Sequence, residues 1–318
     1  MRLLCAALIL ALPTGASAET IYVSNERGGT VSVIDGKTRV VRDTWPVGKR
    51  PRGIALSPDG KRLFLCASDD NAVQVLDVAT GKILAELPSG DDPEQFAVSL
   101  DGKMLFVANE RQDIVTAIDI DKRLVVFQVP TGVEPEGMAV SPDGKFVVST
   151  SETDNDVHWI DIAARAEVAK TSVAQRPRHA QYTADGKYLW VTSEIGGILQ
   201  IIDTSTQQIA SAVTFTIPGI SNDKLMPVGV RFTPDGKSAV VALGRANHIA
   251  IVDTASQKVV RYVAVGKRVW HVGISLDGSF AYTANGLSDT VSVVEIATGE
   301  VVGTIPTGSA PWGVAVGP

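Results

Sequence analysis

The chain has few cysteines and no long basic run, and these shortages exclude several classes of protein. Its 318 residues include two cysteines, and no Cys-x-x-Cys-His segment is present to attach a c-type haem. Neither a phosphate-binding glycine loop nor a Gly-x-Ser-x-Gly elbow occurs. No block of Lys and Arg exceeds two residues and the formal net charge is −6, which argues against nucleic acid as a partner.

The first residues form a segment distinct from the rest of the chain. Arg2 gives a positive start, residues 3–12 are apolar, and Ala16-Ser17-Ala18 is a small-residue cleavage site. This pattern predicts a secretory signal peptide over residues 1–18 and a periplasmic mature chain that begins at Glu19. The alternative is a membrane anchor, but the apolar run is too short to span a bilayer. We therefore expect no transmembrane anchor in the mature chain.

Removal of a signal peptide would also remove Cys5 and leave Cys66 as the one remaining cysteine. A single cysteine cannot form an intrachain disulfide. Cys66 lies in an apolar run where equivalent positions carry Ala, Ser or Thr. We interpret it as a small buried residue and not as a reactive thiol.

Six Asp-Gly dipeptides recur along the chain at a nearly constant spacing. The steps between them are 42, 42, 42, 50 and 42 residues, for dipeptides beginning at Asp59, Asp101, Asp143, Asp185, Asp235 and Asp277. Each unit contains four short apolar runs rich in β-branched and aliphatic residues, and these runs are separated by turn residues. Four antiparallel strands per repeat of about 42 residues are typical of a propeller blade.

The termini complete the last repeat. Residues 311–316 supply only a first strand, and residues 21–48 supply three strands and lack a first one. Pairing of the C-terminal strand with the N-terminal three would close the ring and remove the free sheet edges. The sequence therefore predicts an all-β, seven-bladed β-propeller of four-stranded antiparallel blades, a single domain over residues 19–318.

Candidate site residues lie on the face opposite the repeated Asp-Gly turns, where the loops differ between blades. One register follows each second strand, and the other opens each first strand. Unequal chemistry at equivalent positions suggests a funnel rim that binds a polar ligand, with two tryptophans as an apolar wall. The proposed ligand-binding residues are Glu26, Arg52, Glu94, Glu110, Glu136, Glu152, Arg178, His179, Glu194, Trp270, His271 and Trp312.

Other interpretations of these residues stay open. The charges could instead form a solvated face on which Glu pairs with Arg across blades, each pair contributing about 0–1 kcal/mol. A metal site from His179, His271 and the glutamates lacks a His-x-His pattern or cysteines, and we predict no metal. An eight-residue insertion in the fourth repeat places residues 217–226 on the variable face, either as a lid or partner contact or as a tolerated insertion.

The repeat resembles a known bacterial pattern. Residues 47–68 and 73–82, and again 131–151, follow the series Val-Gly-x-x-Pro-x-Gly-Ile-Ala-Leu-Ser-Pro-Asp-Gly-Lys and Val-x-Val-Ile-Asp-x-Ala-Thr-Gly-Lys. This is similar to the YVTN-type β-propeller repeat, over the whole mature chain. Length, signal peptide, seven units and Asn/Ser-Glu after the second strand also resemble the β-propeller family associated with PQQ-dependent alcohol catabolism.

That narrower resemblance implies a periplasmic accessory role near alcohol oxidation. It implies PQQ at the level of the pathway only, assigns no bound cofactor to this chain, and implies a quinoprotein dehydrogenase or transporter component as partner. No catalytic residues follow from it.

Three functions are compatible with the sequence. The first is a non-catalytic protein that binds a small molecule or a partner. The second is a lactonase-like or other hydrolytic propeller that uses Glu110, Glu152 and His179 for acid–base chemistry. The third is an envelope interaction scaffold, which would expose an apolar patch near residues 217–228.

Overall fold

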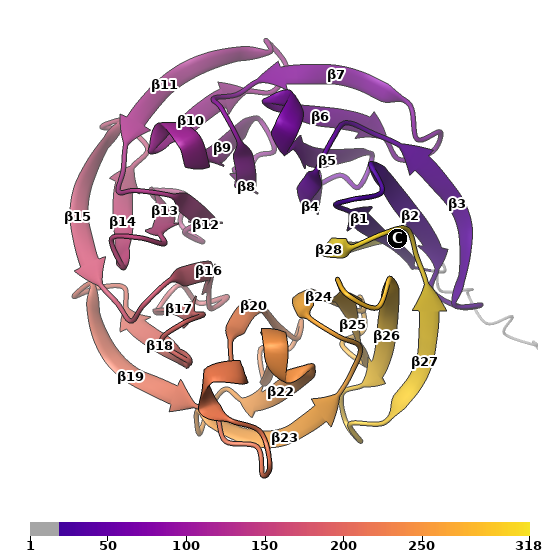
Figure 1. Ribbon diagram of the computed structural model, residues 1–318. Helices are drawn as coiled ribbons and strands as arrows, with labels where there is room; N and C mark the ends of the chain where they lie inside the picture. Colours follow the sequence, from indigo (N-terminus) through magenta and orange to yellow (C-terminus); the bar gives the residue numbers. More distant parts are fainter. Residues whose placement is uncertain (1–18) are drawn as a thin grey trace, which may run out of the picture.

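The computed structural model describes residues 19–318, and the expected signal peptide at 1–18 lies outside the described residues. Twenty-eight strands form seven four-stranded antiparallel sheets arranged around a central axis (Figure 1). The predicted seven-bladed β-propeller is therefore confirmed. Within residues 19–318, no helix is long and apolar enough to cross a membrane.

Each blade has the same order of strands from the axis outwards. The first, innermost strands are β4 (Pro51–Leu56), β8 (Pro93–Val98), β12 (Pro135–Val140), β16 (Pro177–Tyr182), β20 (Pro227–Phe232), β24 (Val269–Ile274) and β28 (Pro311–Gly317). The second strands are β1 (Thr20–Asn25), β5 (Arg62–Ala67), β9 (Met104–Asn109), β13 (Phe146–Ser151), β17 (Tyr188–Ser193), β21 (Ser238–Leu243) and β25 (Phe280–Asn285).

The remaining strands complete the blades towards the rim. The third strands are β2 (Thr30–Asp35), β6 (Ala72–Asp77), β10 (Ile114–Asp119), β14 (Asp156–Asp161), β18 (Ile198–Asp203), β22 (His248–Asp253) and β26 (Thr290–Glu295). The outer strands are β3 (Val40–Pro46), β7 (Ile83–Pro88), β11 (Leu124–Pro130), β15 (Ala166–Ser172), β19 (Gln208–Thr214), β23 (Lys258–Ala264) and β27 (Val301–Pro306).

The ring is closed by strands from the two ends of the chain. β28 pairs antiparallel with β1, and Ile21 lies opposite Val316 in this register. The resulting sheet has the order β28-β1-β2-β3. Because β28 occupies the innermost position of this blade, every blade has its full set of four strands, as the repeat count predicted.

The recurrent Asp-Gly turns connect the first and second strands of the blades. In the β4–β5 turn, Ser57 Oγ donates to Asp59 Oδ1 at 2.5 Å, and the backbone N–H of Lys61 donates to the same oxygen at 3.1 Å. Gly60 takes a positive φ of 68°, which costs least at glycine. Local hydrogen bonds explain why Ser or Thr, Asp and Gly recur at this turn.

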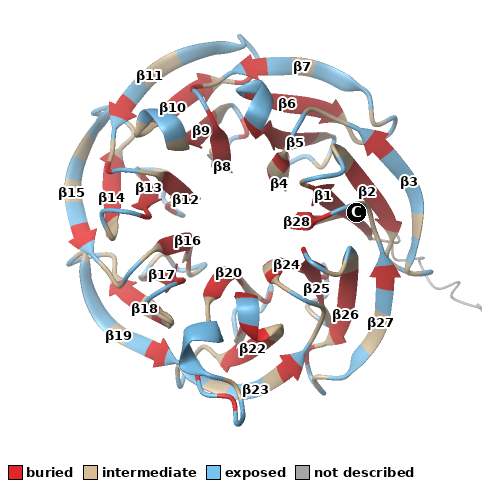
Figure 2. Ribbon diagram, in the orientation of Figure 1, coloured by how far each residue is buried: buried red, intermediate tan, exposed pale blue. Residues whose placement is uncertain are grey.

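Burial decreases from the axis to the rim. Inner and middle strands are largely buried, whereas the outer strands expose much of their surface (Figure 2). The core consists of apolar clusters packed between adjacent blades, such as Tyr22, Leu63 and Leu76 between the first and last blades. Cys66 is fully buried, and burial raises the pKa of its thiol well above the ordinary value, so its interpretation as a core residue is confirmed.

The face that carries the candidate site has its own short elements. No α-helix occurs in the described part of the chain, but four single-turn 3-10 helices do: Ser68–Asp70, Glu110–Gln112, Asn222–Lys224 and Gly244–Ala246. The third belongs to the insertion after β19. We call this side the loop face and the opposite side, with the Asp-Gly turns, the turn face.

The insertion does not expose the apolar patch that the scaffold function requires. Phe215, Ile217 and Leu225 are buried and pack in one core cluster with Trp190 and Val230. The prediction of an exposed patch near residues 217–228 is therefore wrong. The buried apolar residues of the insertion pack between the fourth and fifth blades instead.

Candidate functional site

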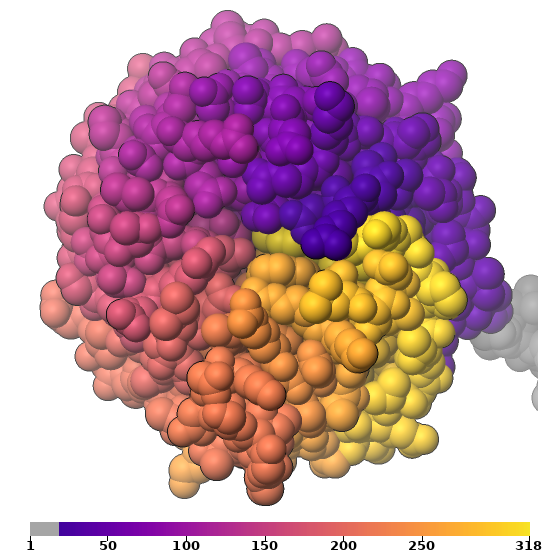
Figure 3. All heavy atoms as spheres, in the orientation of Figure 1, coloured from indigo at the N-terminus to yellow at the C-terminus, as the bar shows by residue number. Residues whose placement is uncertain are grey.

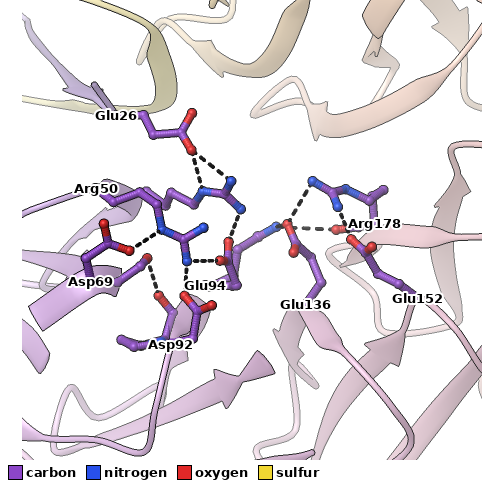
Figure 4. A network of polar contacts seen from close by, with 12 residues as sticks. Glu26, Arg50, Asp69, Asp92, Glu94, Glu136, Glu152 and Arg178 are labelled. Atoms are coloured by element: carbon purple, nitrogen blue, oxygen red, sulfur yellow. Dashed lines mark hydrogen bonds and ion pairs between the residues drawn. The ribbon is translucent and has the colours of Figure 1, made fainter. Parts of the chain in front are cut away.

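The structure brings the two sequence registers together at the loop face, near the axis. Arg52, at the start of β4, donates from Nη2 and Nε to Glu26 Oε1 at 2.8 and 3.0 Å. Glu26 follows β1 in the adjacent blade. This pairing between blades recurs around the ring and joins most of the candidate acids to arginines (Figure 4).

One cluster centres on Glu94. Its carboxylate is fully buried and forms ion pairs with Arg52 and, at 2.7 Å, with Arg50. Burial raises the pKa of Glu94, but Arg52 and Arg50 together hold it below its ordinary value. Arg50 also pairs with Asp92 and, at 3.0 Å, with Asp69.

Glu110 lies beside this cluster without an arginine of its own. Burial, followed by the charge of Glu94 and a hydrogen bond to it, raises the pKa of Glu110 to about 7. Carboxylate oxygens of Asp92, Glu94 and Glu110 lie within 4.8 Å of one another. Because Arg50 already neutralises two of the three, the cluster is better described as a charge network than as a cation site.

A second cluster centres on Arg178, which is 4% exposed. Its guanidinium forms an ion pair with Glu152 and approaches Glu136 at 3.5 Å. Burial raises the pKa of both glutamates, although Arg178 opposes the effect. Within residues 19–318, Arg178 is the one ion-pair partner of Glu136, whereas Glu152 also pairs with Arg176 at 2.9 Å.

Glu194 extends this second cluster to the sixth blade. It pairs with Arg176 at 3.3 Å and with Arg268 at 2.7 Å. Burial raises the pKa of Glu194, but the opposite effect of Arg178 and Arg268 is larger. The pKa of Glu194 is therefore below its ordinary value. The expectation of paired charges across blades is borne out, whereas the expectation of a solvated face is wrong, because the acids of the network are mostly buried.

The two histidines lie deeper, within the channel and not at its rim. The third residues of the first strands alternate around the ring as Gly53, Gln95, Gly137, His179, Gly229, His271 and Gly313. A Cβ on Gly137 would lie 2.8 Å from His179 Cα, so the glycines let the inner strands approach closely. The rings of His179 and His271 lie 5.3 Å apart, and atoms fill the centre of the loop face (Figure 3).

Both nitrogens of His179 are occupied. Nδ1 lies 3.2 Å from Gln95 Oε1, and Nε2 contacts Arg231 Nη1. The amide nitrogen of Gln95 faces Glu136 Oε1 at 3.4 Å, so Gln95 Oε1 accepts from Nδ1–H and Nε2 accepts from arginine. Burial and the neighbouring Arg231 lower the pKa of His179 well below its ordinary value, which keeps the ring neutral.

The predicted acid–base pair of His179 with Glu110 or Glu152 is not formed within the described residues. His179 instead belongs to a hydrogen-bonded chain that runs from Arg231 through Gln95 to Glu136. His271 packs against Trp312 with ring centroids 4.2 Å apart. Among residues 19–318, neither histidine belongs to a group of carboxylates that could hold a metal ion.

The two tryptophans differ in position. Trp312 is 1% exposed and lies behind the network, with Arg52 5.5 Å above its ring. It therefore does not form the expected surface wall. Trp270 does line a cavity of about 560 Å³ on the loop face, and Arg268 stacks on its ring at 3.8 Å.

Two glycines create the space for the side chains of Trp270 and Arg268. A Cβ on Gly286 would lie 2.6 Å from the indole of Trp270, and one on Gly244 would lie 2.8 Å from Arg268 Nη1. These glycines occupy the register that carries glutamate in the four blades with Glu26, Glu110, Glu152 and Glu194. Loss of the acid in blades five and six thus coincides with a cavity.

The cavity beside Trp270 is strongly cationic. Arg27, Arg245, Lys267 and Arg268 line it, with Glu26 as the one acid among its lining residues. Arg27, Arg245 and Lys267 are exposed and take part in none of the ion pairs of residues 19–318. Because the chain as a whole is acidic, this local excess of positive charge is specific to the site.

Sequence reasoning missed the arginines that complete the network. Arg50, Arg176 and Arg268 each lie immediately before a first strand and have left-handed backbone, with φ of 50°, 59° and 55°. The signal for two of them was a charged residue directly before the proline that begins the strand. Arg231 was missed because it lies further along β20.

A seven-bladed propeller with a buried charge network at one mouth is the class of protein that these observations define. A model of the YNCE-like beta-propeller family matches residues 140–317, over half of the chain. The chain belongs to this family, in agreement with the YVTN-type repeat. No curated protein matches it.

Solved structures support the same fold. Hydrazine synthase of Kuenenia stuttgartiensis is similar with a TM-score of 0.72 and 22% identity, over 82% of this chain and 87% of that chain. The dihydro-heme d1 dehydrogenase NirN in complex with DHE is similar with a TM-score of 0.71 and 17% identity, over 95% of this chain and 77% of that chain. At these identities the likeness concerns the fold alone.

Proposed function

We propose that this protein is a non-catalytic periplasmic binding protein, and that its ligand is a flat polycarboxylate bound in the loop-face cavity. The observation that carries the proposal is the combination of Arg27, Arg245, Lys267 and Arg268 around the half-buried indole of Trp270. Arg27, Arg245 and Lys267 have no carboxylate partner within residues 19–318 and can attract an anion, whereas Arg268 is already paired with Glu194. An indole packs against a flat apolar body. The cavity volume of about 560 Å³ is in the usual range for small-molecule sites.

The accessory role near PQQ-dependent alcohol oxidation is part of the same proposal. It rests on the resemblance of the repeat pattern and on the signal peptide that the sequence predicts over residues 1–18. PQQ is itself a flat tricarboxylate, so the charge and shape of the cavity fit it, with Arg245 and Lys267 as exposed cations and Trp270 as the apolar contact. A quinoprotein dehydrogenase or a transporter component is the partner class to examine.

Titration calorimetry with PQQ tests the ligand. We expect binding to the purified protein that weakens as salt rises, because the contacts are ionic. The double variant Arg245→Ala/Lys267→Ala should weaken it at least tenfold, since each lost charge-assisted hydrogen bond contributes about 1.5–3 kcal/mol. These two side chains lie outside the ion-pair network, so the variant should fold normally.

A matched control separates local charge from net charge. Lys187→Ala/Lys237→Ala removes two charges from turn-face lysines whose side chains are 74% and 82% exposed, and it should bind PQQ like the parent protein. Benzene-1,3,5-tricarboxylate tests the class of ligand without the quinone. The proposal would be refuted if neither PQQ nor benzene-1,3,5-tricarboxylate bound, or if both double variants lost the same affinity for PQQ.

The proposed location has its own test. Protein recovered from the periplasmic fraction of the producing cells should begin at Glu19 when its N-terminus is sequenced. Recovery of a chain that retains residues 1–18, or recovery from the cytoplasm alone, would contradict a periplasmic location.

A further inference from the structure

The turn-face end of the channel contains a second cavity, separate from the site proposed above. Its volume is about 570 Å³, and the latter halves of the first strands of four blades line it. Most of the side chains that line it are apolar, with Ile54, Leu56, Phe232, Ile274, Val314 and Val316 among them. One charged side chain, Arg231, is among its lining residues.

Arg231 is the exceptional residue at its position. Equivalent positions of the other first strands carry Ala55, Ala97, Ala139, Gln181, Gly273 and Ala315. Small side chains at most of these positions leave the end of the channel open, and a single arginine extends into it. An arginine of this kind has no structural counterpart in the other blades.

The guanidinium of Arg231 has no anionic partner among residues 19–318. It takes part in none of the ion pairs within 4.0 Å, and burial, unopposed by any carboxylate, lowers the pKa of Arg231 to about 10. The group thus remains charged at neutral pH. The side chain is half-buried at the end of the channel, and a cation without an anionic partner in a cavity is a candidate group for binding a ligand.

The free edge of Arg231 has the geometry to bind a carboxylate. Nη1 is held by His179 Nε2 and by the carbonyl of Val230 at 3.1 Å. Nε and Nη2 have no hydrogen-bond partner within the described chain, and these two N–H groups form the side of the guanidinium that binds a carboxylate in bidentate fashion. His179 fixes the orientation of this fork.

We propose that this cavity binds a small aliphatic carboxylate, with the carboxylate on the Nε/Nη2 edge of Arg231 and the hydrocarbon chain against the apolar walls. The opposite character of the two sites supports separate ligands. The loop-face cavity offers several cations and one aromatic ring, whereas this one offers a single cation among mostly apolar side chains. An amphipathic monoanion matches the second arrangement and a polycarboxylate does not.

Calorimetric titration with octanoate, and with octan-1-ol as the neutral match, tests the assignment. Octanoate should bind, and octan-1-ol should bind at least tenfold more weakly. Arg231→Met keeps the length and apolar stem of the side chain but removes the fork, so it should lose the preference for octanoate. Arg231→Lys retains the charge and should keep part of that preference.

The melting temperature measured without ligand distinguishes a ligand-binding role of Arg231 from a structural one. Arg231→Met should keep a melting temperature close to that of the parent, because the half-buried guanidinium has no ion pair to lose. A lower melting temperature together with unchanged octanoate affinity would show that Arg231 only supports His179 and would overturn the proposal. Failure of octanoate to bind the parent protein would overturn it as well.

The loop-face variant Arg245→Ala/Lys267→Ala is the matched control. It should bind octanoate like the parent, and Arg231→Met should bind PQQ like the parent. The two proposals can therefore fail separately. Loss of octanoate binding in the loop-face variant would contradict the assignment of octanoate to the turn face.

Discussion

At the scale of single residues, the loop face is an ion-pair network whose members have divergent pKa values. Glu94 and Glu194 are held below their ordinary pKa by arginines. Glu110 has a pKa raised to about 7 because burial and Glu94 act on it without a compensating cation of its own. Among these three acids, Glu110 is the one that changes charge near neutral pH.

The protonation of Glu110 couples stability to pH. An acid whose pKa is raised on folding binds its proton more tightly in the native state, so it stabilises the protein fully below its unfolded pKa and loses this effect as pH rises through about 7. We expect the free energy of unfolding to fall between about pH 5.5 and 8 by roughly 1 kcal/mol more in the parent than in Glu110→Gln. This magnitude is reduced from the full shift because the group is partly exposed.

Chemical denaturation at several pH values measures this difference. The buried histidines have lowered pKa values and contribute a slope of opposite sign below about pH 6.5. Their contribution is present in both proteins and cancels in the comparison. Glu300→Gln, at an exposed position, serves as control, and a parallel pH profile for Glu110→Gln and the parent would show that Glu110 is not the titrating group.

At the scale of the strand, the close approach of the inner strands depends on glycine at alternate positions. Gly137→Ala would place a Cβ 2.8 Å from His179 Cα and 3.0 Å from the carbonyl oxygen of Arg178. Neither backbone atom can rotate away, so we expect a loss of about 1–3 kcal/mol in the free energy of unfolding. Equilibrium denaturation with urea measures the loss.

A second glycine offers the control for this prediction. An added Cβ on Gly303, in β27, meets its nearest atom at 3.5 Å, which is ordinary contact. Gly303→Ala should therefore change stability by about 0.5 kcal/mol or less. Similar losses for both variants would indicate that β-propensity, and not crowding, determines the effect of glycine here.

The strand pattern could be predicted from the sequence, whereas the ion-pair network of the loop face could be predicted only in part. Proline begins six of the seven first strands, and Asp-Gly marks the turn that follows in six blades, so local chemistry specifies both ends of the repeat. Equivalent positions indicated that Arg52 and Glu26 meet, because residues at one mouth of a closed ring converge. Their degree of burial was not predictable, since charged residues in a sequence are taken as exposed.

Arg231 illustrates what a repeat comparison overlooks. The Asp-Gly turns are repetitive and indicate a structural role for the turn face, so the repeat pattern does not single out the last residues of the strand before each turn. The lack of a carboxylate near Arg231 also depends on the arrangement of four separate blades. No local pattern contains that information.

At the scale of the whole molecule, closure of the ring depends on the noncovalent pairing of β28 with β1. Deletion of residues 311–318 would leave β1 with an exposed inner edge and should cause aggregation or a much lower melting temperature. A circular permutant with Pro318 linked to Glu19 and new ends between Arg50 and Pro51 keeps every strand. It should melt within about 5 °C of the parent, since cuts between domain elements are often tolerated.

Size-exclusion chromatography and thermal melts of both proteins test this expectation. The permutant controls for a change in the position of the chain ends, because it moves them without removing a strand. If the truncated protein stays monomeric and melts like the parent, the ring can close without the inner strand of its seventh blade.

Seven is an odd number, and a strict alternation of large and small residues cannot return to its starting point around an odd ring. Gly313 and Gly53 are therefore neighbours, and this one mismatch coincides with the junction between the two ends of the chain. The pseudo-rotational symmetry of the scaffold is thereby broken on the axis itself. Any molecule that enters either mouth meets one distinguishable orientation instead of seven equivalent ones.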